Sequence, residues 1–153
     1  MRVHILAAAT ALTVSGPALS AESTPPTAAK VQSTIDAMTS AFAAGDIDGI
    51  LSTYEPGAVV VGEPGMPVTG LPALREMFAR FVALDPKFTF IDHEVVEAGD
   101  IALHLNTWKM EGRLPDGTPV EQGGLSVVVL RKQADGRWLM VIDDPYGDHI
   151  MKR

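Results

Sequence analysis

Cysteine is missing altogether from the 153-residue sequence. Its absence excludes disulfide bonds, thiol catalysis, cysteine-ligated zinc sites and an acylated lipoprotein anchor. The apolar core must therefore hold the fold together by itself.

Basic residues are few. The sequence has 12 lysines and arginines against 19 aspartates and glutamates, which gives a net charge of −7. The basic residues form no cluster, whereas nucleic acids and anionic membrane surfaces bind proteins mainly through such clusters. We therefore expect neither as a partner.

Motifs for metals, nucleotides and a nucleophilic serine are also missing. His93, His104 and His149 lie far apart and form no HxH or HExxH spacing. Asp148-His149 beside Asp143-Asp144 offers only an adventitious cation site. No glycine-rich loop joins an expected strand to an expected helix, and GxSxG does not occur. The sequence therefore predicts no metal and no cofactor.

The N-terminus has the pattern of a secretory signal peptide over residues 1–21. Met1–His4 is short and basic, Ile5–Val14 is apolar, and small residues follow, so that cleavage after Ser20 or after Ala21 fits. The apolar run is too short to span a bilayer. A retained anchor or a buried first helix is the alternative interpretation. We expect an exported protein, in a periplasm or in the medium, without a membrane span.

The remaining chain has the length of one ordinary domain. Removal of the signal peptide takes one arginine with it and leaves a net charge near −8. Residues 22–28 are rich in Ser, Thr and Pro and are predicted to be a flexible lead-in. Residues 29–150 are predicted to be the folded domain.

The first part of the domain has helical periodicity. A long helix is marked by Val31, Ile35, Met38 and Phe42, and Gly45-Asp46 can end it and cap the next helix. Apolar residues at helical spacing predict a short second helix that includes Tyr54, and then a third helix that opens at Gly70-Leu71-Pro72 and ends at Asp85-Pro86. The apolar residues at this spacing are Ile47, Ile50, Leu51 and Tyr54 in the second helix, and Leu74, Met77, Phe78 and Phe81 in the third.

Extended segments follow each other in the second part. A turn at 55–57 leads into a first strand at 59–61, an edge segment covers 66–69, and four longer strands are expected at 87–98, 101–113, 120–132 and 138–144. Short Gly, Asp and Pro turns separate the four, which predicts an antiparallel meander. Gly123-Gly124 inside the third of these strands predicts a bulge or a sharp bend.

The stretch from Phe42 to Phe81 carries a resemblance. AGDIDGI, then Tyr54, a Val-rich strand, an acid-Pro turn and GLPALREMF resemble the nuclear transport factor 2-like superfamily, in its SnoaL-like and ketosteroid isomerase-like branch. The resemblance covers about residues 33–148. It implies an α+β fold: a cone-shaped barrel made of a strongly curved, mainly antiparallel sheet, with three N-terminal helices packed in its concave face. It also implies a pocket for a small apolar molecule and a homodimer.

The family's catalytic pattern transfers only in part. A ketosteroid isomerase uses an Asp base, with a Tyr and a protonated Asp that hydrogen-bond the enolate oxygen. In this sequence the Tyr position falls on Met38 and the protonated Asp position near Val128. The base position falls on Gly62 without a gap, or on Glu63 with one inserted residue. Only Glu63 could keep its role, so the steroid-type mechanism is not expected.

Tyr54, Glu63 and Asp143 remain as candidate catalytic residues. The resemblance turns Val141 and Asp143 inward, where burial would raise the pKa of the carboxyl as a general acid or base requires. Alternatively, Asp143 and Asp144 are surface acids at a strand end. The hydroxyl of Tyr54 is expected either to face the cavity or to sit at the rim of an apolar contact.

The strand at 101–113 alternates between two faces. Ile101, Leu103 and Leu105 form the more apolar one, which we expect to pack on the helices. That assignment places His104, Asn106 and Trp108 on the outer sheet face, where the resemblance implies the dimer interface.

Two functions fit these observations. The first is an exported SnoaL-like protein that binds a small hydrophobic or aromatic molecule and performs cofactor-free acid–base chemistry of the isomerase, dehydratase or cyclase type. The second is a non-catalytic ligand-binding or dimerisation domain, which the missing Tyr and Asp favour.

Overall fold

The computed structural model describes residues 26–152, so the expected signal peptide lies outside the described residues. Within that range, no helix is both long and apolar enough to cross a membrane. The elements are α1 (Thr27–Ala44), α2 (Ile47–Leu51), β1 (Tyr54–Glu63), β2 (Met66–Thr69), α3 (Leu71–Val82), β3 (Lys87–Ala98), β4 (Ile101–Arg113), β5 (Pro119–Lys132), β6 (Trp138–Asp144) and the 3-10 helix η1 (His149–Lys152).

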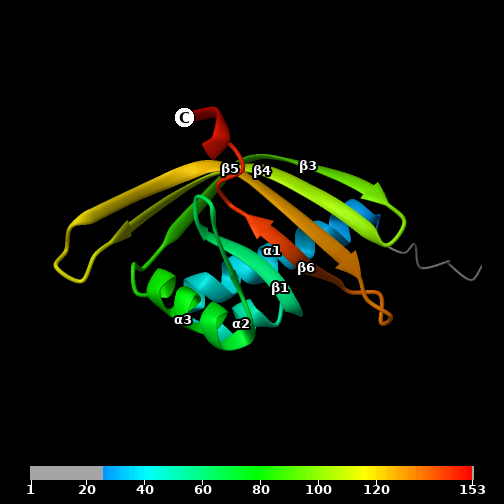
Figure 1. Ribbon diagram of the computed structural model, residues 1–153, viewed down its shortest axis with the longest axis horizontal. Helices are drawn as coiled ribbons and strands as arrows, with labels where there is room; N and C mark the ends of the chain where they lie inside the picture. Colours follow the sequence, from blue (N-terminus) through cyan, green and yellow to red (C-terminus); the bar gives the residue numbers. More distant parts are fainter. Residues whose placement is uncertain (1–25, 153) are drawn as a thin grey trace, which may run out of the picture.

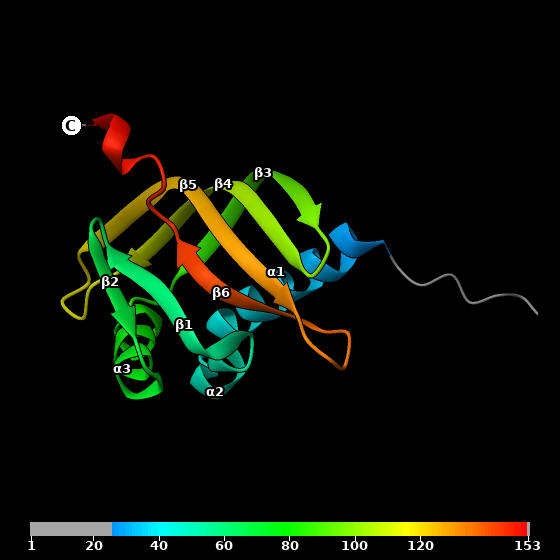
Figure 2. The ribbon, with the colours of Figure 1, turned by 45° about the vertical axis from the view of Figure 1, so that its right-hand side comes forward.

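The six strands form one sheet in the order β2-β1-β6-β5-β4-β3. All neighbours are antiparallel except β1 and β6, which run parallel. The sheet arches over the three helices, which lie together on its concave side (Figure 1, Figure 2). The predicted α+β cone and the β3-to-β6 meander are therefore confirmed, with a sheet that stays open at β2 and β3.

Local signals predicted the junction between α1 and α2 correctly, whereas α3 ends at Val82, before the predicted end at Asp85-Pro86. Gly45 ends α1 with φ 68°, a left-handed conformation that glycine adopts without steric cost. The next residue, Asp46, caps α2 because its carboxylate accepts a hydrogen bond of 2.9 Å from the Gly49 amide. At the other end, α1 begins at Thr27, so the last two residues of the predicted lead-in are helical.

The spacing of the apolar residues predicted that Tyr54 belongs to the short helix, and this prediction is wrong. The helix α2 ends at Leu51, and Tyr54 is the first residue of β1, where it pairs with Met140 of β6. The predicted turn at 55–57 is also wrong: these residues continue the strand, and the register with β6 shifts between Tyr54 and Val59. The segment is thus an irregular stretch of strand, as a bulge would make it.

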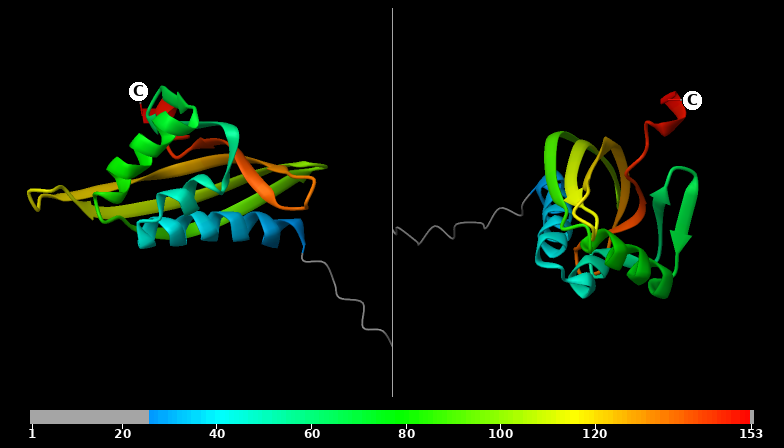
Figure 3. Two further views of the ribbon diagram at one scale, coloured as in Figure 1. Left: turned by 90° about the horizontal axis from the view of Figure 1, so that it is seen from below. Right: turned by 90° about the vertical axis from the view of Figure 1, so that its left-hand side faces the viewer.

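The core lies between the helices and the concave sheet face. The buried residues of α1 and α3 belong to one apolar cluster with inward side chains of β5 and β6, among them Leu130, Trp138 and Met140. The view from below shows α1 running along the sheet, while α3 covers the end near β1 and β2 (Figure 3). The helical core residues are Val31, Ile35, Phe42, Ile50, Leu51, Leu74, Met77 and Phe78.

Gly123 and Gly124 permit close contacts and do not form the predicted bulge. The register between β4 and β5 is continuous through both residues. A Cβ atom on Gly123 would lie 2.7 Å from the Trp108 carbonyl oxygen, and one on Gly124 would lie 3.1 Å from an Asp148 carboxylate oxygen. Bulges occur elsewhere, at Ile91 in β3 and at Val141 in β6.

Gly123→Ala is expected to destabilise the protein by about 1–3 kcal/mol, because the new methyl group meets backbone that can move only if β4 and β5 separate. The matched control is Gly57→Ala, since a Cβ atom on Gly57 meets nothing within 4 Å. Urea unfolding of both variants measures the difference. Equal effects would contradict the role given to Gly123.

Candidate functional site

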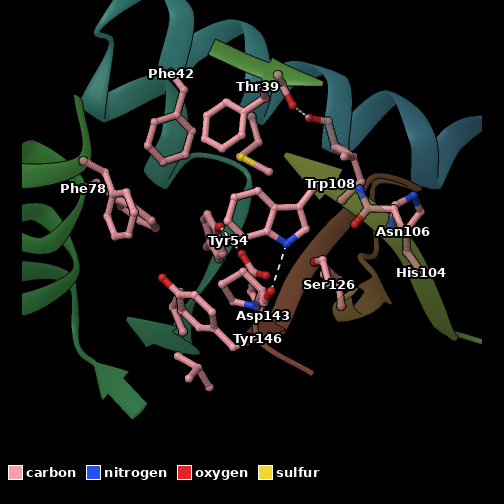
Figure 4. A pocket seen from close by; sticks show the side chains of 18 of the residues that line it. Thr39, Phe42, Tyr54, Phe78, His104, Asn106, Trp108, Ser126, Asp143 and Tyr146 are labelled. Atoms are coloured by element: carbon pink, nitrogen blue, oxygen red, sulfur yellow. Dashed lines mark hydrogen bonds between the residues drawn. The ribbon is translucent and has the colours of Figure 1, made fainter. Parts of the chain in front are cut away.

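A cavity of about 90 Å³ lies between the concave sheet face, α1 and α3. One bound water needs roughly 10–15 Å³ on the same measure, so the space suits a small organic molecule. Side chains from α1, α3 and the inner faces of β1, β3, β4, β5 and β6 line it (Figure 4).

Aromatic rings form most of the wall. Phe42 meets Phe78 edge to face, with 5.6 Å between ring centroids, and Phe88 at the same distance. Trp108 lies 6.1 Å from Phe88, and Tyr54 lies 5.3 Å from Phe78. Such walls favour flat or apolar ligands, because ring contacts and burial both stabilise them.

Tyr54 and Asp143 form a buried polar pair at the cavity wall. The Tyr54 hydroxyl donates a hydrogen bond of 2.6 Å to Asp143 Oδ2, and the two side chains are 4% and 8% exposed. Asp143 therefore faces inward, whereas Asp144 caps the following turn by accepting a hydrogen bond from the Tyr146 amide. Of the two interpretations of these acids, the inward one holds for Asp143.

Burial sets the ionisation of this pair. Desolvation raises the pKa of Asp143 to about 6; the hydrogen bond from Tyr54 lowers it, and the negative charge of Asp144 raises it. The pKa of Tyr54 is raised well above its ordinary value, first by burial and then by the charge of Asp143. Tyr54 thus stays protonated as a donor, and Asp143 can exchange a proton near neutral pH.

The bulge in β6 turns Asp143 toward the cavity. Trp138 and Met140 point inward, and strict alternation would then turn Asp143 outward. The extra residue Val141 has no partner in the register with β5, so the alternation changes by one residue after it. The expectation that Val141 and Asp143 share the inner face is therefore wrong for Val141, which does not line the cavity.

Glu63 is exposed at the end of β1 and does not line the cavity. Tyr146 does line the cavity, and the charges of both Glu63 and Asp143 act on its hydroxyl. Its pKa is raised first by burial and then by the negative charges of Glu63, Asp143 and Asp144. Glu63 thus lies outside the cavity in the neighbourhood of Tyr146, while Asp143 lines the interior.

The assignment of the two faces of β4 was wrong. His104, Asn106 and Trp108 are 0%, 6% and 6% exposed and line the cavity, whereas Leu103 and Leu105 point outward. The indole nitrogen of Trp108 donates a hydrogen bond of 2.9 Å to the Pro145 carbonyl. The rule that the more apolar face packs inward fails because a cavity accepts polar side chains and the outer face is apolar as well.

His104 is tied to α1 through its ring. Its Nε2 lies 3.1 Å from Gln32 Oε1, and Gln32 Nε2 in turn donates a hydrogen bond of 2.9 Å to Asp36 Oδ1. Burial lowers the pKa of His104 to about 4; the nearby His93 also lowers it, and Asp36 raises it. His104 is therefore neutral at physiological pH.

The three positions that the family pattern suggests without an inserted residue lie at the cavity, but none of them carries a polar side chain. Met38, Val128 and Gly62 all line it. Gly62 packs closely on α3, since a Cβ atom there would lie 2.9 Å from the Met77 sulfur. Among residues 26–152, no three His, Asp or Glu side chains are grouped to hold a metal ion.

Comparison with known proteins identifies the family. A family model described as SnoaL-like domain matches residues 35–141. The chain belongs to the SnoaL-like domain family. Among curated proteins, none matches the sequence significantly.

Solved structures of several other proteins share the fold. A ketosteroid isomerase-like protein from Erwinia carotovora atroseptica is 22% identical, with a TM-score of 0.65 over 76% of this chain and 92% of its own. A protein from Catenulispora acidiphila, solved in complex with S-DNPA, is 19% identical, with a TM-score of 0.67 over 82% and 97%. A protein from Xanthomonas campestris, provisionally named a calcium/calmodulin-dependent protein kinase II association domain, is 18% identical, with a TM-score of 0.69 over 81% and 91%. At these identities the likeness shows the nuclear transport factor 2-like fold alone.

Asp143 and His104 are expected to give opposite pH dependences of stability. Folding raises the pKa of Asp143, so its contribution to stability is complete below about pH 4 and is lost as the pH rises through about 6. Folding lowers the pKa of His104, so its contribution is present above about pH 6.5 and is lost as the pH falls toward 4.

Asp143→Asn is therefore expected to gain stability relative to the unaltered protein as the pH rises from 4 to 7, by roughly 3 kcal/mol for a shift of about two pKa units. Urea unfolding at several pH values measures this difference. A difference that does not vary with pH would contradict the burial effect on Asp143.

Proposed function

We propose that this protein is an acid–base enzyme of the isomerase, dehydratase or cyclase type, acting on a small hydrophobic or aromatic molecule without a cofactor. The observation that carries the proposal is the buried carboxyl of Asp143, which takes a hydrogen bond from Tyr54 at the wall of an aromatic cavity. The isomerase-like name of the Erwinia protein agrees with it.

Asp143 is the group that moves the proton. A carboxyl with a pKa of about 6 is mostly ionised at pH 7 and can take a proton from a carbon next to a carbonyl. The same carboxyl, once protonated, can return the proton to another atom of the bound molecule. The wall around the carboxyl is mostly apolar, and such surroundings strengthen the electrostatic interactions in the site.

Tyr54 positions this carboxyl. Its hydroxyl is committed to Asp143 Oδ2, which leaves Asp143 Oδ1 for the substrate. The ring of Tyr54 packs against Phe78, so the hydroxyl has little freedom to turn away. Glu63 is the weaker candidate because it is exposed and lies outside the cavity lining.

A non-catalytic binding or assembly domain is the second candidate. It is supported by Met38 and Val128, which place no polar group where ketosteroid isomerases carry their Tyr and protonated Asp. The provisional name of the Xanthomonas campestris protein, an association domain, also fits this candidate.

Proton exchange in heavy water separates the two candidates. The purified protein is expected to accelerate exchange of the protons next to the carbonyl of 2-cyclohexenone or 2-tetralone, with a rate that rises with pH through about 6 as Asp143 ionises. Asp143→Asn should lower the rate at least about 100-fold, because a general base contributes that much or more. NMR signal loss measures the exchange.

Glu63→Gln is the matched control and should exchange at a rate close to that of the unaltered protein. Equal losses in the two variants, or no acceleration of either ketone at any pH, would contradict the enzymatic proposal and favour the binding domain.

We further propose that the protein is exported and forms a homodimer through the outer sheet face. Export is supported by the signal-peptide pattern of residues 1–21. The dimer is supported by apolar side chains on the convex face: Leu103 pairs with Val129, Leu105 pairs with Val127, and Ile142 is 44% exposed beside them. Apolar faces of this kind are typical of homodimer interfaces.

Leu105→Asp is expected to convert the dimer into a monomer, since a charge at the centre of an apolar interface would be buried without a partner. Light scattering after size-exclusion chromatography measures the mass. Ser40→Asp on the exposed side of α1 is the control and should remain dimeric. A monomeric parent protein would refute the proposed interface.

A further inference from the structure

Two buried acceptor atoms at one end of the cavity have no hydrogen-bond partner. They are His104 Nδ1 and Asn106 Oδ1, on the inner face of β4. Both residues line the cavity and are at least nine-tenths buried. A buried polar atom without a partner costs free energy, so a native protein keeps such atoms mainly where something else binds them.

The hydrogen-bond chain from α1 makes His104 Nδ1 an acceptor. The amide nitrogen of Gln32 is used by Asp36, which leaves the Gln32 oxygen to face the ring. The neutral ring must then carry its proton on Nε2, which donates to that oxygen, and Nδ1 keeps a free lone pair. Asn106 Oδ1 is a carbonyl oxygen and can only accept. The two atoms therefore call for a donor.

These acceptors lie apart from the acid–base pair. His104 pairs with Val128 of β5, and Val128 pairs with Asp143 of β6, so two strand spacings, about 10 Å, separate the two residues along the sheet. In Figure 4 the His104 and Asn106 side chains lie to one side of the Trp108 indole, and the Tyr54 and Asp143 side chains lie below it. A ring packed against Trp108 could reach both ends.

We propose that the ligand is a ring compound with a hydroxyl or amino group at the end opposite to its reacting carbon, and that His104 Nδ1 and Asn106 Oδ1 accept hydrogen bonds from that group. This inference rests on the proposed function for the reacting end at Asp143. It adds the chemical class of the substrate and names the two residues that select it.

Binding of phenol, aniline and toluene tests the inference. The three probes have the same ring and nearly the same size, and only phenol and aniline can donate a hydrogen bond. The purified protein is expected to bind phenol and aniline about tenfold more tightly than toluene, because toluene leaves both acceptors unpaired. NMR titration at millimolar concentrations measures the dissociation constants.

The variants His104→Phe and Asn106→Leu keep the shapes of the side chains and remove the acceptors. Each should reduce the preference for the donors, and the double variant should bind all three probes within about twofold of one another. Toluene binding shows that the double variant keeps a folded pocket, and the two single variants carry the test if it does not. Thr39→Val is the matched control, since the Thr39 hydroxyl lines the cavity but donates to the Ile35 carbonyl.

The outcomes separate this inference from the proposed function. Equal binding of the three probes to the unaltered protein, or an unchanged preference in both single variants, overturns the donor-selecting role and leaves the proton exchange by Asp143 standing. Failure of every probe to bind overturns the inference together with the ligand-binding part of the proposed function. A donor preference without any proton exchange upholds the inference for a binding domain.

Discussion

The hydrogen bond between Tyr54 and Asp143 is the interaction on which this account of the site depends. It joins the first residue of β1 to the end of β6, the one parallel pair among the described strands, and closes the cavity wall between them. It also gives a buried carboxyl its donor, without which burial would be more costly. Burial in the apolar surroundings raises the pKa of both groups, whereas the hydrogen bond itself lowers the pKa of Asp143 and raises that of Tyr54.

Two departures from regular structure bring the pair together. The register of β1 with β6 shifts after Tyr54, and the extra residue Val141 changes the alternation of β6. In a regular sheet Asp143 would follow Met140 on the opposite face and point to solvent. The cavity therefore depends on irregular strands at its polar wall, while the aromatic wall comes from regular helices and strands.

The fold could be predicted from the sequence to a large extent because its signals are local. Gly45, Asp46 and the turns between the long strands act within a few residues, and the bounds of β3, β4 and β6 agree with the expected segments. Tyr54 was misplaced because it continues the helical spacing of Ile47, Ile50 and Leu51, whereas its pairing with Met140 is distant in the sequence. Gly123 was misread because its tight contact is with the backbone of another strand.

The site was less predictable than the fold. Asp143 was expected to face inward from the resemblance, but the bulge that turns it is not visible in the residue pattern. His104 and Asn106 were placed outside because both faces of β4 are rich in apolar residues, so the pattern gives the alternation and leaves its direction open. The signal that could have placed them is the exposed, charged neighbour Lys109, which continues the outer face beyond Leu105 and Thr107.

A titration of the Asp143 carboxyl carbon by NMR tests the central claim most directly. The account predicts a midpoint near pH 6, well above the ordinary value for aspartate. A midpoint near pH 4 would mean that the carboxyl is solvated, and would contradict the buried acid–base pair from which the proposed chemistry follows.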